Sequence, residues 1–174
     1  NPGLSGMVQM GISDLFEDHK IIGGFRLALD LKNNDYALTY IDLKHRLDRK
    51  AIVQRQSLQG LSNFGVVKVQ THLASYQLSW PFSELASLRG SVMYRHDRYV
   101  LQSTDLFTLS TANAYDQLVG GKLEYVYDSS VPRGLNLYTG WKAKVFGEYY
   151  MQPDQQRSNM QVFGLDLRHS LRIH

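Results

Sequence analysis

The chain has 174 residues, enough for one domain with a sizeable core, and it has no cysteine, which excludes a disulfide scaffold and cysteine-based metal sites. Its formal net charge of +3 is too small to indicate a nucleic-acid partner by itself. No apolar run approaches the roughly 18 residues of a transmembrane helix. The mean hydropathy of −0.31 is ordinary for a soluble protein, but transmembrane β-barrels share it, because only alternate residues of their strands face lipid.

Nine extended stretches follow one another along the chain, and no internal segment has a convincing helical pattern. We predict strands at 5–14, 20–32, 35–45, 50–59, 66–80, 87–101, 115–128, 141–151 and 159–174. The pattern in 66–80 changes near Ala74, which predicts a β-bulge there. The pattern also breaks off within the last stretch, so we expect residues 1–174 to be a single, incomplete β-domain.

Most of these stretches alternate apolar with polar or charged residues, as strands do when one side of a sheet is apolar. In the last stretch, Phe163, Leu165 and Leu167 share one side, and Asp166 and Arg168 share the other. The apolar side would be the core of a soluble sandwich or barrel, whereas in a membrane barrel it would face lipid and the charged side would line a wet interior.

The length of the strands and the order of the connections favour the membrane barrel. Many stretches reach the roughly 9–11 residues that a membrane-spanning strand needs, against about 5–6 in globular proteins. The tight connections 16–20 and 81–85 lie at one end of antiparallel strands, and the longer polar ones, 102–113 and 152–159, lie at the other. Outer-membrane barrels have short periplasmic turns and long extracellular loops, so the longer connections are predicted to be extracellular.

The aromatic residues form two groups once strand directions are assigned. We expect Trp80, Phe82, Tyr125, Tyr127 and Trp141 at the end with the tight turns, and Tyr94, Tyr99, Tyr149 and Tyr150 at the opposite end. Two belts of aromatic residues around an apolar band are typical of the two interfaces of a membrane. The candidate interface residues are Trp80, Tyr94, Tyr125, Tyr127, Trp141 and Tyr149.

These patterns together predict an antiparallel transmembrane β-barrel, present in part, whose charged side faces the lumen. The predicted lumen-facing residues are Arg26, Asp30, Arg95, Asp97, Lys122, Glu124, Lys142, Lys144, Glu148, Asp166 and Arg168. The residues predicted to face lipid at the middle of the membrane are Leu27, Leu29, Val92, Leu123, Val145, Leu165 and Leu167.

Three segments carry a family resemblance, and they read SGMVQMGISDLFEDHKIIGGFRLALDLKNNDYALTYIDLKHR, SYQLSWPFSELASLRGSVMYRHDRY and YVYDSSVPRGLNLYTGWKAKVFGEY. They resemble the BamA-like barrel of the bacterial surface antigen superfamily, of the type that follows a TolB-like propeller in Bacteroidota. The chain differs from that family at Tyr138-Thr139-Gly140, where a proline usually precedes the glycine, and at 16–19, which lack an expected glycine.

The resemblance implies a sixteen-stranded barrel in the outer membrane of a Gram-negative bacterium, of which this segment is a little over half. It implies a scaffold for the assembly, insertion or export of outer-membrane proteins. The expected partners are membrane lipid, the remainder of the barrel with its periplasmic domains, and client outer-membrane proteins.

Other chemistry has weaker support in the sequence. The six histidines lack the short spacings of a zinc site, and Ser13-Asp14 with His19 is explained by turn chemistry, so we expect no metal, no cofactor and no catalytic residue. The basic stretch 44–50 lacks interleaved aromatic residues, so we expect no nucleic acid. An outer-membrane barrel enzyme, such as a hydrolase, and a soluble β-barrel binding protein remain the alternatives.

Overall fold

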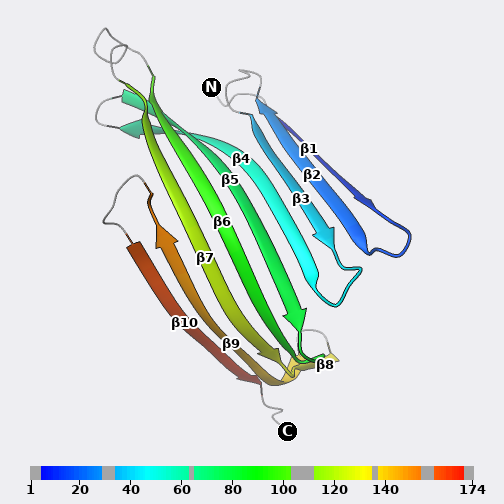
Figure 1. Cartoon of the computed structure of the whole chain (residues 1–174). Helices are drawn as coiled ribbons and strands as arrows, with labels where there is room; N and C mark the ends of the chain where they lie inside the picture. The colour runs from blue at the N-terminus through cyan, green and yellow to red at the C-terminus, as the bar shows by residue number, and fades with distance from the viewer. Residues whose placement is uncertain are drawn as a thin grey trace.

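The computed structural model describes residues 5–28, 34–62, 65–102, 112–134, 137–153 and 159–170. The described residues form one antiparallel sheet without a second layer (Figure 1). Its strands are β1 (Ser5–Ser13), β2 (His19–Ala28), β3 (Asp35–Asp42), β4 (Asp48–Ser62), β5 (Gly65–Pro81), β6 (Ala86–Leu101), β7 (Ala114–Asp128), β8 (Val131–Gly134), β9 (Leu137–Met151) and β10 (Asn159–Ser170). The order in the sheet follows the chain, with the short β8 beside β9, and β1 does not pair with β10.

The prediction of an all-β antiparallel sheet is confirmed, and all nine predicted strands are present. The sequence pattern missed β8, which has only four residues and contains Pro132. The bulge predicted near Ala74 was wrong, because β5 pairs with β4 and β6 without a shift in register. No helix that could cross a membrane occurs among the described residues.

Adjacent strands are connected alternately at two ends of the sheet. Residues 14–18, 43–47 and 82–85 connect strands at what we call the turn end, and 29–34, 63–64, 102–113 and 152–158 connect them at the loop end. Hydrogen bonds close two of the tight turns. The backbone N–H of His19 donates to Oδ1 of Asp14 at 3.0 Å, and that of Phe82 donates to the carbonyl of Ala86 at 2.9 Å. Asp14 therefore has the turn role that the sequence predicts.

The register assigns every side chain to one of two faces. Residues directly opposite each other in neighbouring strands share a face, and we name the two after their composition. The apolar face carries Val92, Leu123, Val145 and Leu165, and the polar face carries Lys122 and its neighbours.

Rows of directly opposite residues lie progressively farther from the turn end along the sheet from β1 to β7. One row on the apolar face passes through Ile12, Ile21, Tyr40, Ala51, Tyr76, Val92, Gly121, Tyr149 and Gln161. Ile12 lies one residue from the turn end of its strand, Tyr76 five residues and Gly121 seven residues. The row thus rises by about one residue per strand. With a rise of about 3.3 Å per residue and a strand spacing of about 4.8 Å, this stagger corresponds to a strand tilt of about 35°.

Two glycines on the polar face lie beneath aromatic rings of the opposite strand. Gly120 in β7 is directly opposite Tyr150 in β9, and Gly164 in β10 is directly opposite Phe146 in β9. A Cβ at Gly120 would lie 2.6 Å from Cε1 of Tyr150, and a Cβ at Gly164 would overlap the Phe146 ring. Only glycine leaves space for the rings at these positions.

Substitution of Gly120 by alanine is expected to destabilise the sheet, because the new methyl group displaces the Tyr150 ring. The expected loss in the free energy of unfolding is about 1–3 kcal/mol, measured by denaturant titration of the chain refolded in detergent micelles. Gly90→Ala is the control, since the nearest atom to its Cβ is Cδ1 of Leu123 at 3.8 Å. Equal losses in the two variants would contradict this account.

Candidate functional site

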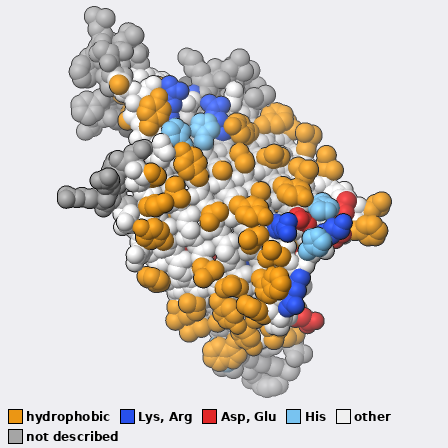
Figure 2. Space-filling model, viewed as in Figure 1, with side chains coloured by type: hydrophobic (Ala, Val, Ile, Leu, Met, Phe, Trp, Pro, Cys, Tyr) orange, Lys and Arg blue, Asp and Glu red, His pale blue; other side chains and the backbone are white. Residues whose placement is uncertain are grey.

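The apolar face is exposed along its whole length. The side chains of Val92, Leu123, Val145 and Leu165, all predicted to face lipid, are between 52% and 64% exposed. No hydrophobic residue in the described part of the chain is buried. Figure 2 shows hydrophobic side chains across the middle of one face, with Lys, Arg and His side chains gathered near its ends. The sheet therefore has a large apolar surface and no core of its own.

The polar face holds the charged side chains in pairs of opposite sign. Every predicted lumen-facing residue that the structure describes lies on this face, whereas Asp30 lies outside the described residues, as does Leu29 of the lipid-facing set. The ion pairs are Arg26–Asp35 at 3.6 Å, Arg89–Glu124 at 3.6 Å, Arg95–Asp97 at 2.8 Å, Lys122–Glu124 at 3.2 Å, Lys122–Glu148 at 3.1 Å, Lys142–Asp128 at 3.1 Å and Arg168–Asp166 at 2.8 Å. Most of these pairs join neighbouring strands, so they tie the sheet together laterally.

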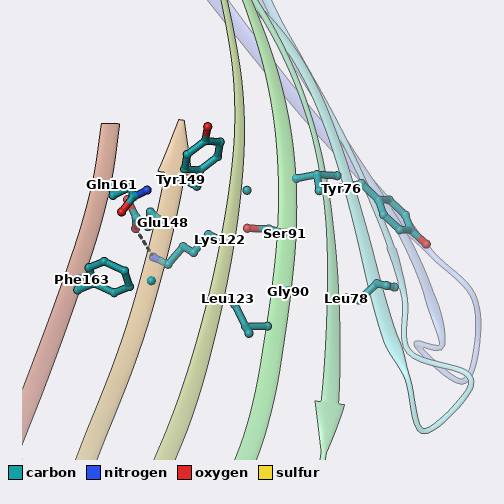
Figure 3. A pocket seen from close by; sticks show the side chains of 13 residues that line it. Tyr76, Leu78, Gly90, Ser91, Lys122, Leu123, Glu148, Tyr149, Gln161 and Phe163 are labelled. Atoms are coloured by element: carbon teal, nitrogen blue, oxygen red, sulfur yellow. Dashed lines mark ion pairs between the residues drawn. The ribbon is translucent and has the colours of Figure 1, made fainter. Parts of the chain in front are cut away.

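Lys122 is the centre of this network. Its ammonium group lies between the carboxylates of Glu124 on its own strand and Glu148 on β9, and Figure 3 shows the second pair. The hydroxyl of Tyr150 donates to Oε2 of Glu148 at 2.8 Å. Nζ of Lys122 also lies 4.8 Å from the centre of the Phe146 ring. The two carboxylates are mostly shielded by these neighbours, with exposed fractions of 14% and 17%.

A second polar group lies nearer the loop end of the same face. Asp97, only 5% exposed, accepts a hydrogen bond from the hydroxyl of Thr71 at 2.6 Å in addition to its pair with Arg95. Asp116, directly opposite Asp97, accepts from the side-chain amide of Gln152 at 3.1 Å. A charged residue is thus among the most buried in the sheet, while the large apolar residues are exposed.

The six candidate interface aromatics all lie on the apolar face. Trp80, Tyr125, Tyr127 and Trp141 lie toward the turn end, and Tyr94 and Tyr149 lie farther toward the loop end. Tyr99 and Tyr150, expected in the same belt as Tyr94, were wrongly grouped with it, because their odd spacing from their neighbours puts them on the polar face.

The basic stretch 44–50 belongs to a turn and the start of β4. Nε and Nη2 of Arg46 donate to the carbonyl of Pro81 at 3.3 and 3.2 Å, and the guanidinium lies 5.0 Å from the centre of the Trp80 ring. These contacts join the turn before β4 to the turn after β5. Arg46 thus has a structural role at the turn end.

The described histidines have varied surroundings. Nδ1 of His19 lies 3.1 Å from the hydroxyl of Tyr40 and 3.6 Å from Asp42, and the His169 ring stacks on Trp141 with centroids 4.0 Å apart. In the described ranges no group of three or more His, Asp or Glu side chains could hold a metal ion. The absence of metal, cofactor and catalysis stays a prediction.

Sequence patterns could not supply the partners across the sheet. The polar face includes Asp35, Arg89, Asp116 and Asp128, which were not among the candidates and are recognised only from the register. We compared the chain with family models, curated proteins and solved structures, and none of the three comparisons found a match.

Substitution of Lys122 by methionine is expected to destabilise the sheet, because it removes the cation shared by Glu124 and Glu148. The expected loss in the free energy of unfolding is about 2 kcal/mol, measured in micelles by denaturant titration. Arg168→Met is the control, since its side chain is 72% exposed and solvent screens its pair with Asp166, so the loss should be much smaller. A loss at Lys122 no greater than the loss at Arg168 would refute the central role of Lys122.

Proposed function

We propose that this chain forms part of the wall of a transmembrane β-barrel in the outer membrane of a Gram-negative bacterium. The observation that carries the proposal is the exposed apolar face of a single-layer sheet whose buried side chains are polar. In water, apolar patches of this size are covered by another layer or partner. Lipid is the cover that also explains why the opposite face is charged and paired.

The stagger of the strands supports a barrel wall. A tilt of about 35° is close to the range of about 35–45° found in transmembrane barrels. The strands from β4 to β7 have 15 to 17 residues, enough to cross the apolar layer at this tilt and to extend beyond it. A closed wall would also need strands that pair with the free edges of β1 and β10, because unpaired backbone groups are too costly in lipid.

The role of the barrel is proposed from the family resemblance alone. We propose that it serves as a scaffold for the assembly, insertion or export of outer-membrane proteins, with periplasmic domains and client proteins as partners. Reconstitution of the full-length protein in vesicles tests this role: it should accelerate the insertion of an unfolded outer-membrane protein. An unchanged insertion rate would remove insertion from the proposal and leave the barrel wall.

Cysteine labelling tests the position of the apolar face. The chain has no native cysteine, so single variants such as Val92→Cys, Leu123→Cys and Val145→Cys report on one site each. In vesicles, a water-soluble maleimide should label these positions at least about tenfold more slowly than Lys144→Cys and Arg168→Cys, because lipid excludes the reagent. Faster labelling on the apolar face than on the polar face would contradict the lipid-facing position of the apolar face.

The orientation predicted from the connections is tested by epitope insertion. A tag after Thr108, which lies outside the described residues, should bind antibody on intact cells, because long loops of outer-membrane barrels are extracellular. A tag in the turn at 82–85 is the control and should bind only after permeabilisation. The opposite pattern would reverse the topology.

A further inference from the structure

Four basic side chains gather on the apolar face, between the middle of the strands and the loop end. Arg55 in β4, His72 in β5 and His96 in β6 are directly opposite one another across three strands, and Arg98 follows His96 by two residues on the same face. The His72 and His96 rings have centroids 6.3 Å apart. Figure 2 shows blue and pale blue side chains together at the upper left of this face. We call these four residues the basic cluster.

The basic cluster has no compensating acid among the described residues. Neither Arg55 nor Arg98 forms an ion pair there, in contrast to Arg95 and Lys122 on the polar face. Nε of both arginines and Nδ1 of both histidines are shielded from solvent and have no hydrogen-bond partner in that part of the chain. Shielded polar atoms without partners are unfavourable, and an anion would supply acceptors to the two guanidinium groups.

An aromatic side chain helps to hold the basic cluster in place. The His96 ring stacks on the ring of Tyr115 with centroids 5.7 Å apart, and the guanidinium of Arg98 lies 6.0 Å from the same ring. Tyr115 is on β7, directly opposite Arg98. The side chains of His96 and Arg98 are therefore oriented by the sheet.

A shallow apolar depression begins where the basic cluster ends. It has a volume of about 390 Å³, and on the apolar face it is lined by Ala51, Val53, Ala74, Tyr76, Val92, Tyr94 and Val119. Val53, Ala74 and Tyr94 are the next residues on this face after Arg55, His72 and His96.

The depression continues into a larger apolar groove. Tyr76 and Val92 also line this groove, which has a volume of about 640 Å³ and passes over Gly90, Gly121 and Gly147. Figure 3 shows Tyr76 and Gly90 among the residues that line it. A continuous apolar surface thus ends at two guanidinium groups and two imidazole rings, which is the shape and chemistry of a site for an anionic amphiphile.

We propose that the basic cluster binds the phosphate group of a lipid headgroup, with an acyl chain of that lipid in the adjoining depression. Guanidinium groups bind phosphate through two parallel hydrogen bonds, and an imidazole N–H can donate a further one. The proposal rests on the proposed function for its lipid surroundings, since the cluster lies at the edge of the apolar band, where headgroups meet the strands.

The test measures lipid binding by the full chain in micelles of an uncharged detergent. Phosphatidic acid is the probe, phosphatidylcholine is the lipid without an accessible phosphate monoester, and inorganic phosphate is the probe without acyl chains. We expect phosphatidic acid to bind most tightly. Arg55→Gln should weaken its binding about tenfold, and combination with Arg98→Gln should weaken it further. Arg49→Gln is the matched control, on the same strand and face but at the turn end, and should bind as the unchanged chain does.

Three results would overturn the proposal: unchanged binding in the Arg55→Gln/Arg98→Gln variant, an equal loss in Arg49→Gln, or inorganic phosphate binding as tightly as phosphatidic acid. Circular dichroism of each variant verifies that the sheet is intact, and Arg55→Lys, which keeps the charge, should retain part of the affinity. Flotation of the chain with phosphatidylcholine vesicles is measured separately. Loss of flotation refutes the membrane wall, whereas flotation with unchanged lipid binding in the double variant refutes only the phosphate site.

Discussion

A sheet of one layer has no interior, and the other features of this molecule depend on that constraint. Alternate side chains point to opposite sides of each strand, so every strand contributes to both faces. Charged side chains of the polar face find partners within the sheet, because residues such as Lys122 and Glu148 reach one another across the strands. The apolar face cannot, since side chains such as Leu123 find little area to bury against their neighbours. The surroundings of the sheet therefore have to cover its apolar face.

Charge compensation divides the molecule into regions with different requirements. Arg95 and Asp97 on the polar face neutralise each other, so this pair needs no charged ligand and can lie next to water. On the apolar face, Arg55 and Arg98 form no ion pair with a carboxylate in the described ranges. Charges that are paired within the sheet need no ligand, whereas unpaired charges of one sign favour the binding of a ligand of opposite charge.

The sequence predicted the strands and the faces of the sheet because both depend on local alternation. It could not predict pairs such as Lys122–Glu148, since these depend on register across 26 positions. The bulge predicted at Ala74 was wrong for a related reason. On the face that carries Tyr76, the residues become polar beyond Ala74 because the apolar band ends at His72, whereas the register of the strand does not change. The basic cluster could not be predicted from the sequence either, since its members lie on three strands and come together only when the register is known.

The rings above glycines have a consequence for how the strands find their register. A slip of one residue would put apolar side chains on the wrong face, but a slip of two residues keeps every face and is the more dangerous error. A two-residue slip between β7 and β9 would move Tyr150 from Gly120 to Leu118 or Lys122, whose side chains would lie where Gly120 has none. Phe146 would lose Gly164 in the same way after a slip between β9 and β10. Gly120 and Gly164 thus favour the register in which each aromatic ring lies opposite a glycine.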